Sequence, residues 1–255
     1  MKTVAVVGKN KKAVKRLIHD LRAARFRVTN HPEAVITLGG DGTYLFAERK
    51  YPGIPKIIIR DNSICNQCNE NTLHEIINSL HTRAYTIQEN LTLSATITHR
   101  SGRKKVYTPV QCTNDLILRN KDPTQALRYT VAINGKQIDG TLIGDGIVAA
   151  TPFGSTAYFY SVTRKKFVRG IGLAFNNTTI HLPPQVLPET ARITITIIRN
   201  DAEFAADNNP AVLIVHPGDT ITITKAHHPA KIIKLKIGWK GLIDKLFNNR
   251  RRSLF

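Results

Sequence analysis

A glycine-rich turn at residues 39–43 is the first feature of this 255-residue chain whose residue types could do chemistry. It reads GGDGT, follows the apolar stretch at residues 35–38 and precedes a helix-like run. Glycines let the backbone turn tightly and present N–H groups to an anion, and the following helix adds its positive dipole end. Because a carboxylate repels phosphate, Asp41 fits this turn if it takes a proton from an attacking hydroxyl or holds a metal ion that bridges phosphates. Aspartate is also a good helix N-cap, and the turn alone fits either interpretation.

A second glycine-punctuated segment, at residues 144–158, adds hydroxyls and another aspartate. It reads GDGIVAATPFGSTAY, and the polar stretch Thr113-Asn114-Asp115 lies upstream of it. Two polar, glycine-containing segments beside apolar runs favour a phosphate-binding or catalytic role for Asp41 over a simple cap.

Hydrophobic periodicity predicts a small parallel α/β domain over residues 1–85, which contains the GGDGT loop. The expected strands are residues 3–7, 35–38 and 57–59. One helix is expected over residues 11–25, and a second carries its apolar face at residues 73–80. Thr72 and Glu75 form a capping-box signature at the start of that second helix. Alternation of strands and helices is typical of a parallel sheet.

Residues 86–225 change to a two-residue period, which predicts an all-β antiparallel sandwich. Apolar and polar residues alternate over residues 91–98, 193–197 and 221–223, and residues 129–133 run into Asn134-Gly135, a strong hairpin signal. Residues 226–255 then form a basic C-terminal segment. Its amphipathic stripe from Trp239 to Leu246 is expected to pack on the protein itself rather than on a membrane.

Charge is the unusual feature of the composition: 37 Lys and Arg against 18 Asp and Glu give a net charge of +19. Such a surface attracts nucleotides, polyphosphate, nucleic acid and anionic lipid without choosing among them. No apolar run approaches the ~18–20 residues needed to cross a bilayer, so no membrane partner is expected. Three cysteines, an odd number, fit a reducing compartment, and we expect a cytoplasmic protein.

GGDGT, the Asn114-Asp115 pair before an apolar strand and the later segment DG…TPFGSTAY together resemble the NAD kinase family, in the same order and at compatible spacing. The resemblance extends from the first strand to the KLKIGW stretch near the end of the chain. GGDGT alone is shared with lipid kinases and, as a variant, with phosphofructokinases, whereas TPFGSTAY is much more specific. The resemblance implies a phosphofructokinase-like α/β domain, a β-sandwich that binds NAD, and a C-terminal segment that returns to the first domain.

The reaction that this resemblance implies is transfer of the γ-phosphate of ATP to the adenosine 2′-hydroxyl of NAD, with Mg²⁺ accompanying ATP. Asp41 would be the general base, and the loop around it would hold the phosphates. The implied phosphate-binding residues are Gly39, Gly40, Gly42 and Thr43. The implied NAD-binding residues are Asn114, Asp115, Asp145, Thr156, Ala157, Tyr158 and Ser161. The family also implies a homo-oligomer, a dimer or a tetramer.

The sequence departs from the family pattern at several points. The glycine-rich segment expected near residues 59–65 reads IRDNSIC, and the usual glutamate after Asn114 is the shorter Asp115. Residues 159–164 read FYSVTR in place of a small-residue stretch, and the expected Asp-Gly is Asp207-Asn208. These departures indicate a remote branch and bear on substrate preference more than on phosphoryl transfer.

Several alternatives stay open at this level. A nucleotide-binding relative without activity and a lipid kinase both fit parts of the pattern. The donor could be ATP or polyphosphate and the acceptor NAD or NADH, and the basic charge allows accessory nucleic-acid binding. Cys65 and Cys68 form a lone CxxC, for which free thiols are the commoner outcome than a metal site.

Overall fold

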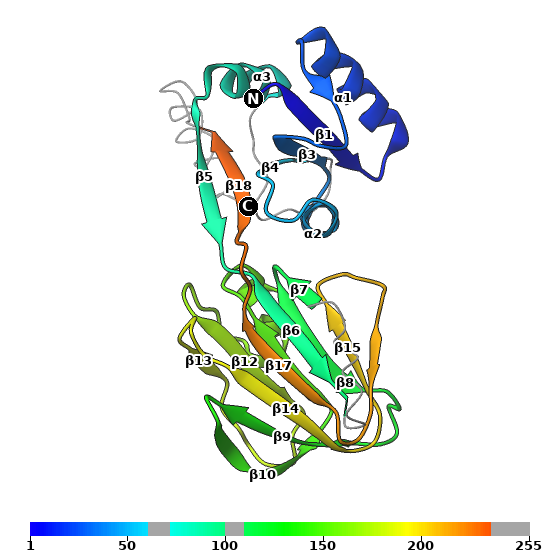
Figure 1. Cartoon of the computed structure of the whole chain (residues 1–255), viewed down its shortest axis with the longest axis vertical. Coiled ribbons are helices and arrows are strands. Elements are labelled where there is room, and N and C mark those ends of the chain that lie inside the picture. The colour runs from blue at the N-terminus through cyan, green and yellow to red at the C-terminus, as the bar shows by residue number, and fades with distance from the viewer. Residues whose placement is uncertain (61–71, 100–109, 236–255) are drawn as a thin grey trace, which may run out of the picture. The chain divides into compact units, whose positions relative to one another are not determined.

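The computed structural model describes residues 1–60, 72–99 and 110–235. It divides into two compact units. Unit 1 comprises Met1–Ala47, Ile54–Gln88 and the described part of Lys231–Phe255, and unit 2 comprises Glu48–Gly53 and Glu89–Ala230. In the described ranges the strands form three sheets of six strands each (Figure 1).

Unit 1 is built around one sheet with the strand order β2-β1-β3-β4-β18-β5. Strand β1 pairs in parallel with β2 and β3, β3 pairs with β4, and β4 pairs with β18. The elements are β1 (Thr3–Gly8), α1 (Lys11–Ala23), β2 (Arg27–Val28), β3 (Ala34–Leu38), α2 (Asp41–Lys50), β4 (Lys56–Ile59), α3 (Leu73–Thr82), β5 (Tyr85–Asn90) and β18 (Ala230–Leu235).

The α/β organisation expected for residues 1–85 is confirmed, because each expected strand and helix is present. Helix α3 begins with the expected capping box: Thr72 N donates to Glu75 Oε2 (2.7 Å), and Glu75 N donates to Thr72 Oγ1 (3.3 Å). The returning C-terminal segment is seen as β18, which joins the sheet next to β4. A β-strand from residue 230 onward therefore completes a sheet begun at the N-terminus.

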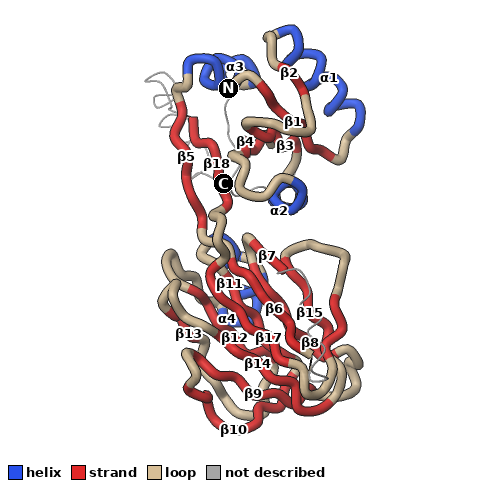
Figure 2. Tube along the Cα trace, in the orientation of Figure 1, coloured by secondary structure: helices blue, strands red, loops and turns tan. Residues whose placement is uncertain are grey.

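Most of the regular secondary structure of unit 2 is strand, joined by loops (Figure 2). One sheet has the order β10-β9-β14-β17-β6-β7 and the other the order β13-β12-β11-β8-β15-β16. The elements are β6 (Leu93–Thr98), β7 (Val110–Cys112), β8 (Asp115–Asn120), β9 (Leu127–Ile133), β10 (Lys136–Gly144), β11 (Gly146–Ala150), the 3₁₀ helix η1 (Phe153–Thr156), α4 (Tyr158–Thr163), β12 (Ile171–Asn176), β13 (Gln185–Leu187), β14 (Ile193–Arg199), β15 (Ala202–Ala206), β16 (Leu213–Val215) and β17 (Thr220–Lys225).

The antiparallel sandwich is confirmed, and alternate residues of both sheets meet in one buried core. The hairpin at Asn134-Gly135 is also confirmed: both residues have positive φ (50° and 83°), as a type I′ turn requires. Strand β11 is buried along its whole length because its second face is covered by α4, through a cluster that includes Val148, Ala150 and Phe159. A central strand with two covered faces reads as a continuous apolar run.

Two sequence features lie outside the described residues. These are the Cys65 and Cys68 pair and the amphipathic stripe from Trp239 to Leu246.

Candidate functional site

The twelve candidate residues divide between the two units. Residues 39–43 belong to unit 1, and the seven candidate NAD-binding residues belong to unit 2.

The GGDGT loop of unit 1 joins β3 to α2. Gly39 has a φ of +146°, and a Cβ there would meet Thr43 Oγ1 at 2.4 Å, so this position requires glycine. Tyr44 N donates to the backbone oxygen of Gly40 (3.3 Å), which places Gly40 at the N-cap and Asp41 at the first helical position. Asp41 is partly exposed at the positive end of the helix. The structure therefore disfavours Asp41 as the N-cap residue.

Residues 113–115 of unit 2 lead from the end of β7 into the first residue of β8, and two residues hold their backbone. The carboxylate of Asp207 accepts from the amides of Thr113 (2.9 Å), Asn114 (2.7 Å) and Asp115 (3.2 Å), and Asp207 N donates to Asp115 O (2.9 Å). Thr151 N donates to Asn114 O (2.8 Å), and Thr151 Oγ1 donates to Thr113 O. Each backbone N–H and C=O of the segment is thus paired.

The TPFGSTAY segment packs directly against this backbone. Thr151 is fully buried, and its hydroxyl also accepts from Gly154 N (3.1 Å). Helix η1 begins there and is followed by α4, whose first residue is Tyr158. The hydroxyl of Thr151 therefore connects the segment at residues 113–115 to the start of η1.

The side chains of Asn114 and Asp115 differ in their surroundings. Asp115 is 4% exposed. The pKa of its carboxyl is raised from 3.8 to about 7, mainly by burial and also by the nearby Asp207, while a hydrogen bond from the Tyr158 amide acts in the opposite direction. Burial also raises the pKa of Asp207, against the effect of its three amide hydrogen bonds. Asn114 Oδ1 is buried and has no hydrogen-bond partner within the described part of the chain.

Asp145 lies at the other end of β11 from this segment. Its side chain accepts from Asn177 Nδ2 (2.9 Å), and its amide donates to Asn176 O (2.9 Å). Thr151 follows Asp145 by six positions, which is roughly 20 Å along a strand. The structure therefore does not bring Asp145 next to Asn114 within one chain.

Tyr158 lies between these two ends. Its amide donates to the Asp115 carboxyl, and its hydroxyl lies 3.5 Å from Asn176 Nδ2. Thr156, Ala157 and Ser161 are exposed next to it, and Ser161 Oγ donates to Tyr158 O (2.7 Å). These four residues can therefore contact a ligand along the start of α4.

A cavity in unit 2 lies beside the Asp207 loop. Its volume is about 480 Å³, and its lining includes Arg49, Cys112, Thr113, Asp207 and His228. Arg49 Nη1 donates to Asn208 Oδ1 (3.2 Å). Burial and the nearby Asp207 and Asp115 charges raise the pKa of the Cys112 thiol, so it behaves as a buried apolar group.

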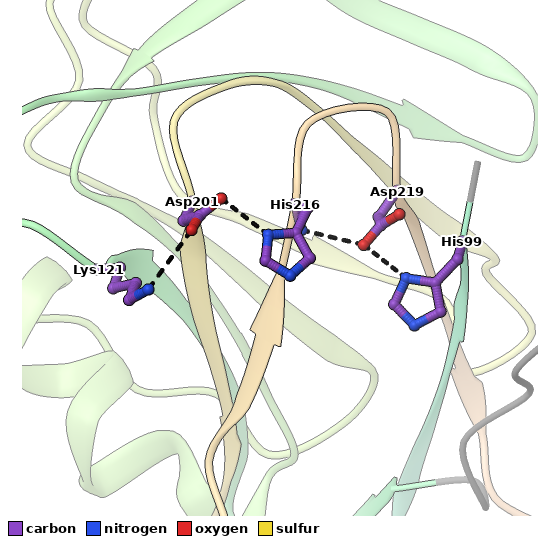
Figure 3. Close-up of polar contacts among 5 residues, drawn as sticks. All are labelled: His99, Lys121, Asp201, His216 and Asp219. Atoms are coloured by element: carbon purple, nitrogen blue, oxygen red, sulfur yellow. Dashed lines mark hydrogen bonds and ion pairs between the residues drawn. The ribbon is translucent and has the colours of Figure 1, made fainter. Parts of the chain in front are cut away.

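A second polar cluster lies at the opposite end of β15 from Asp207 (Figure 3). Asp201 accepts from His216 Nδ1 (2.9 Å) and lies 3.4 Å from Lys121 Nζ, and these contacts lower its pKa. Asp219, 4% exposed, contacts His99 Nδ1 at 2.7 Å and accepts from His216 N (3.0 Å). Through these hydrogen bonds and ion pairs, the cluster links the chain segments around Lys121, Asp201 and His216 at that end of the sandwich.

Two residues that organise the site were not identified as site residues from the sequence. In the sequence, Asp207 stands out only as a departure from an Asp-Gly pair, and Thr151 only as part of the longer motif. Within residues 1–60, 72–99 and 110–235, no group of three or more His, Cys, Asp or Glu side chains could hold a metal ion. No helix of those residues combines the length and hydrophobicity of a transmembrane segment.

A family model and individual relatives all indicate similarity to NAD kinases. Residues 113–235 match the family model described as the ATP-NAD kinase C-terminal domain. The chain is 28% identical to an NAD kinase of Koribacter versatilis over 241 residues, which cover 90% of this chain and 82% of that protein. It is 29% identical to an NAD kinase of Sulfurisphaera tokodaii over 241 residues, which cover 88% of each.

Solved structures share the fold at lower sequence identity. Yeast NADH kinase complexed with NADH superposes with a TM-score of 0.82 at 15% identity, covering 97% of this chain and 88% of that one. An NAD kinase from Archaeoglobus fulgidus in complex with ATP gives a TM-score of 0.73 at 20% identity, covering 96% and 98%. By the family-model match, residues 113–235 belong to the ATP-NAD kinase family, and the chain as a whole is similar to NAD kinases.

Proposed function

We propose that this protein is an NAD kinase, which transfers the γ-phosphate of ATP to the adenosine 2′-hydroxyl of NAD and releases NADP and ADP. The observation that carries this proposal is the match of residues 113–235 to the ATP-NAD kinase family model, a range that includes both polar segments of unit 2. The intact GGDGT loop at the start of α2 supports the same reaction in unit 1.

Asp41 is the proposed general base. A sugar hydroxyl is a weak acid, so a carboxylate within hydrogen-bond reach assists by accepting its proton as the new O–P bond forms, a contribution of roughly 10²–10⁴-fold. Gly39, Gly40, Gly42 and Thr43 would hold the phosphates next to it. Mg²⁺ enters as part of the ATP substrate, where it neutralises phosphate charge.

The proposed NAD-binding residues are Asn114, Asp115, Asp145, Thr156, Ala157, Tyr158 and Ser161. The amide of Asn114 can both donate and accept hydrogen bonds, which suits a base edge or a ribose. Asp115 is more buried than Asn114. It is therefore expected to contribute to NAD binding mainly by holding the start of α4 through its hydrogen bond with the Tyr158 amide.

We further propose a cytoplasmic homo-oligomer, either a dimer or a tetramer. The location rests on the odd number of cysteines and the oligomer on the resemblance to the family. Light scattering on the purified protein measures the number of subunits. Retention on RNA with a steep salt dependence would reveal accessory nucleic-acid binding.

The decisive experiment is an assay of NADP formation by the purified protein with ATP and Mg²⁺. Replacing ATP by polyphosphate identifies the donor, and replacing NAD by NADH identifies the acceptor. NAD binding without product would indicate a relative that has lost the reaction. Phosphorylation of a lipid, with none of NAD or NADH, would indicate a lipid kinase.

A further inference from the structure

Asp207 and Thr151 pair the backbone N–H and C=O groups of residues 113–115. Three consecutive amides donate to the carboxylate of Asp207, that of Thr113 to both oxygens, and the amide of Asp207 itself donates to Asp115 O. Asp207 has a φ of 50°, a left-handed conformation that aspartate tolerates, in the turn after β15. The turn therefore places a charged acceptor opposite three N–H donors.

A carboxylate suits this position because it offers acceptors only. Oδ1 of Asp207 lies within 3.2 Å of all three amides, and Oδ2 lies 2.9 Å from Thr113 N. An asparagine would place an NH₂ donor against one of those N–H groups. Hydrogen bonds to a charged acceptor are shorter and stronger than neutral ones, so this arrangement fixes the segment.

With the backbone of the segment fully paired and the Asp115 carboxyl bonded to the Tyr158 amide, the Asn114 side chain is left for a ligand. The Asn114 side chain is the informative one, because its Oδ1 is buried and has no partner in the described part of the chain. A buried acceptor without a donor costs free energy, which a donor from a bound ligand would recover. A small rotation of the backbone at Asn114 would move this oxygen away from that ligand.

We propose that Asp207 is a positioning residue for the dinucleotide: through its carboxylate contacts with residues 113–115 it sets the orientation of Asn114 without touching substrate. This inference rests on the proposed function, since it assigns Asn114 to NAD. Asp201 is the matched control for Asp207. It lies just before β15, whereas Asp207 lies just after it, and its carboxylate contacts His216 and Lys121 (Figure 3).

The first test measures amide hydrogen exchange in the protein without nucleotide. Asp207→Asn and Asp207→Ala are expected to speed exchange at residues 113–115, more so for alanine, while Asp201→Asn leaves it unchanged. Unaltered exchange in both Asp207 variants would overturn the inference.

The second test compares NAD and ATP as ligands by calorimetry, together with steady-state kinetics. Asp207→Asn is expected to weaken NAD binding by about 10–100-fold, the size of a lost hydrogen bond to a charged group, and to change ATP binding less than threefold. Equal weakening of both ligands, or faster exchange with unchanged NAD binding, would mean that Asp207 is only structural and would overturn the inference. Wild-type protein that binds NAD but makes no NADP would refute the proposed reaction alone, and the binding comparison would still decide on Asp207.

Discussion

The backbone oxygen of Asn114 lies 2.2 Å from the point that a Cβ atom on residue 154 would occupy. Gly154 is therefore required by a close approach between the TPFGSTAY segment and the segment at residues 113–115. Backbone cannot move aside as the end of a flexible side chain can, so any larger residue must displace one of the two segments.

Gly154→Ala is accordingly expected to destabilise the protein by about 1–3 kcal/mol, as overpacking of a tight site does. It should also raise the KM for NAD, because Asn114 would shift. Urea unfolding and NADP assays measure the two effects. Gly140→Ala is the matched control, since a Cβ there meets nothing within 4 Å. Similar stability of the two variants would show that the approach is not tight in solution.

The hydroxyl of Thr151 provides a second prediction. Thr151→Val keeps the shape of a fully buried side chain but removes the donor to Thr113 O and the acceptor for Gly154 N. Leaving buried backbone groups unpaired is expected to cost about 1–3 kcal/mol of unfolding free energy. Thr151→Ser retains the hydroxyl and should cost less. The prediction is wrong if the serine variant unfolds at lower urea concentration than the valine variant.

Local patterns were sufficient for much of the fold. The period of apolar residues predicted β1, α1 and α3, and the Asn134-Gly135 pair predicted its hairpin, because each depends on residues close in sequence. Strand β5 was not predicted, since its neighbour in the sheet is β18 and its side chains are mostly exposed.

The organisation of the site depends on contacts that no local pattern contains. Asp207 reaches residues 113–115 because β15 pairs with β8, and the register of that pairing places Ala206 opposite Leu116. The sequence contained one signal, an aspartate in the turn where the family has Asp-Gly, but it did not indicate what the carboxylate contacts. The same holds for Asp145, whose distance from Asn114 follows from the length of β11.

Asp41 provides a prediction about chemistry in unit 1. Asp41→Asn removes the proposed proton acceptor while keeping the size of the side chain, so NADP formation should be lost and NAD binding should remain. Asp20→Asn, on the face of α1 beside His19, is the control and should keep full activity. Near-normal turnover of the Asp41 variant would show that another group accepts the proton.

The raised pKa of Asp115 predicts a pH dependence of stability. Its carboxyl titrates at about 7 in the folded protein against 3.8 as the ordinary value, so the folded state binds the proton more tightly than the unfolded state. The contribution of Asp115 to the free energy of unfolding therefore falls as pH rises from about 4 to about 7, by at most about 1.4 kcal/mol per unit. Asp115→Asn should flatten this decline in urea titrations across that range, whereas Asp139→Asn, at an exposed position of β10, should not. If the Asp115 variant declines as steeply as the wild type, the carboxyl is ionised throughout the range and the folded state does not hold the extra proton.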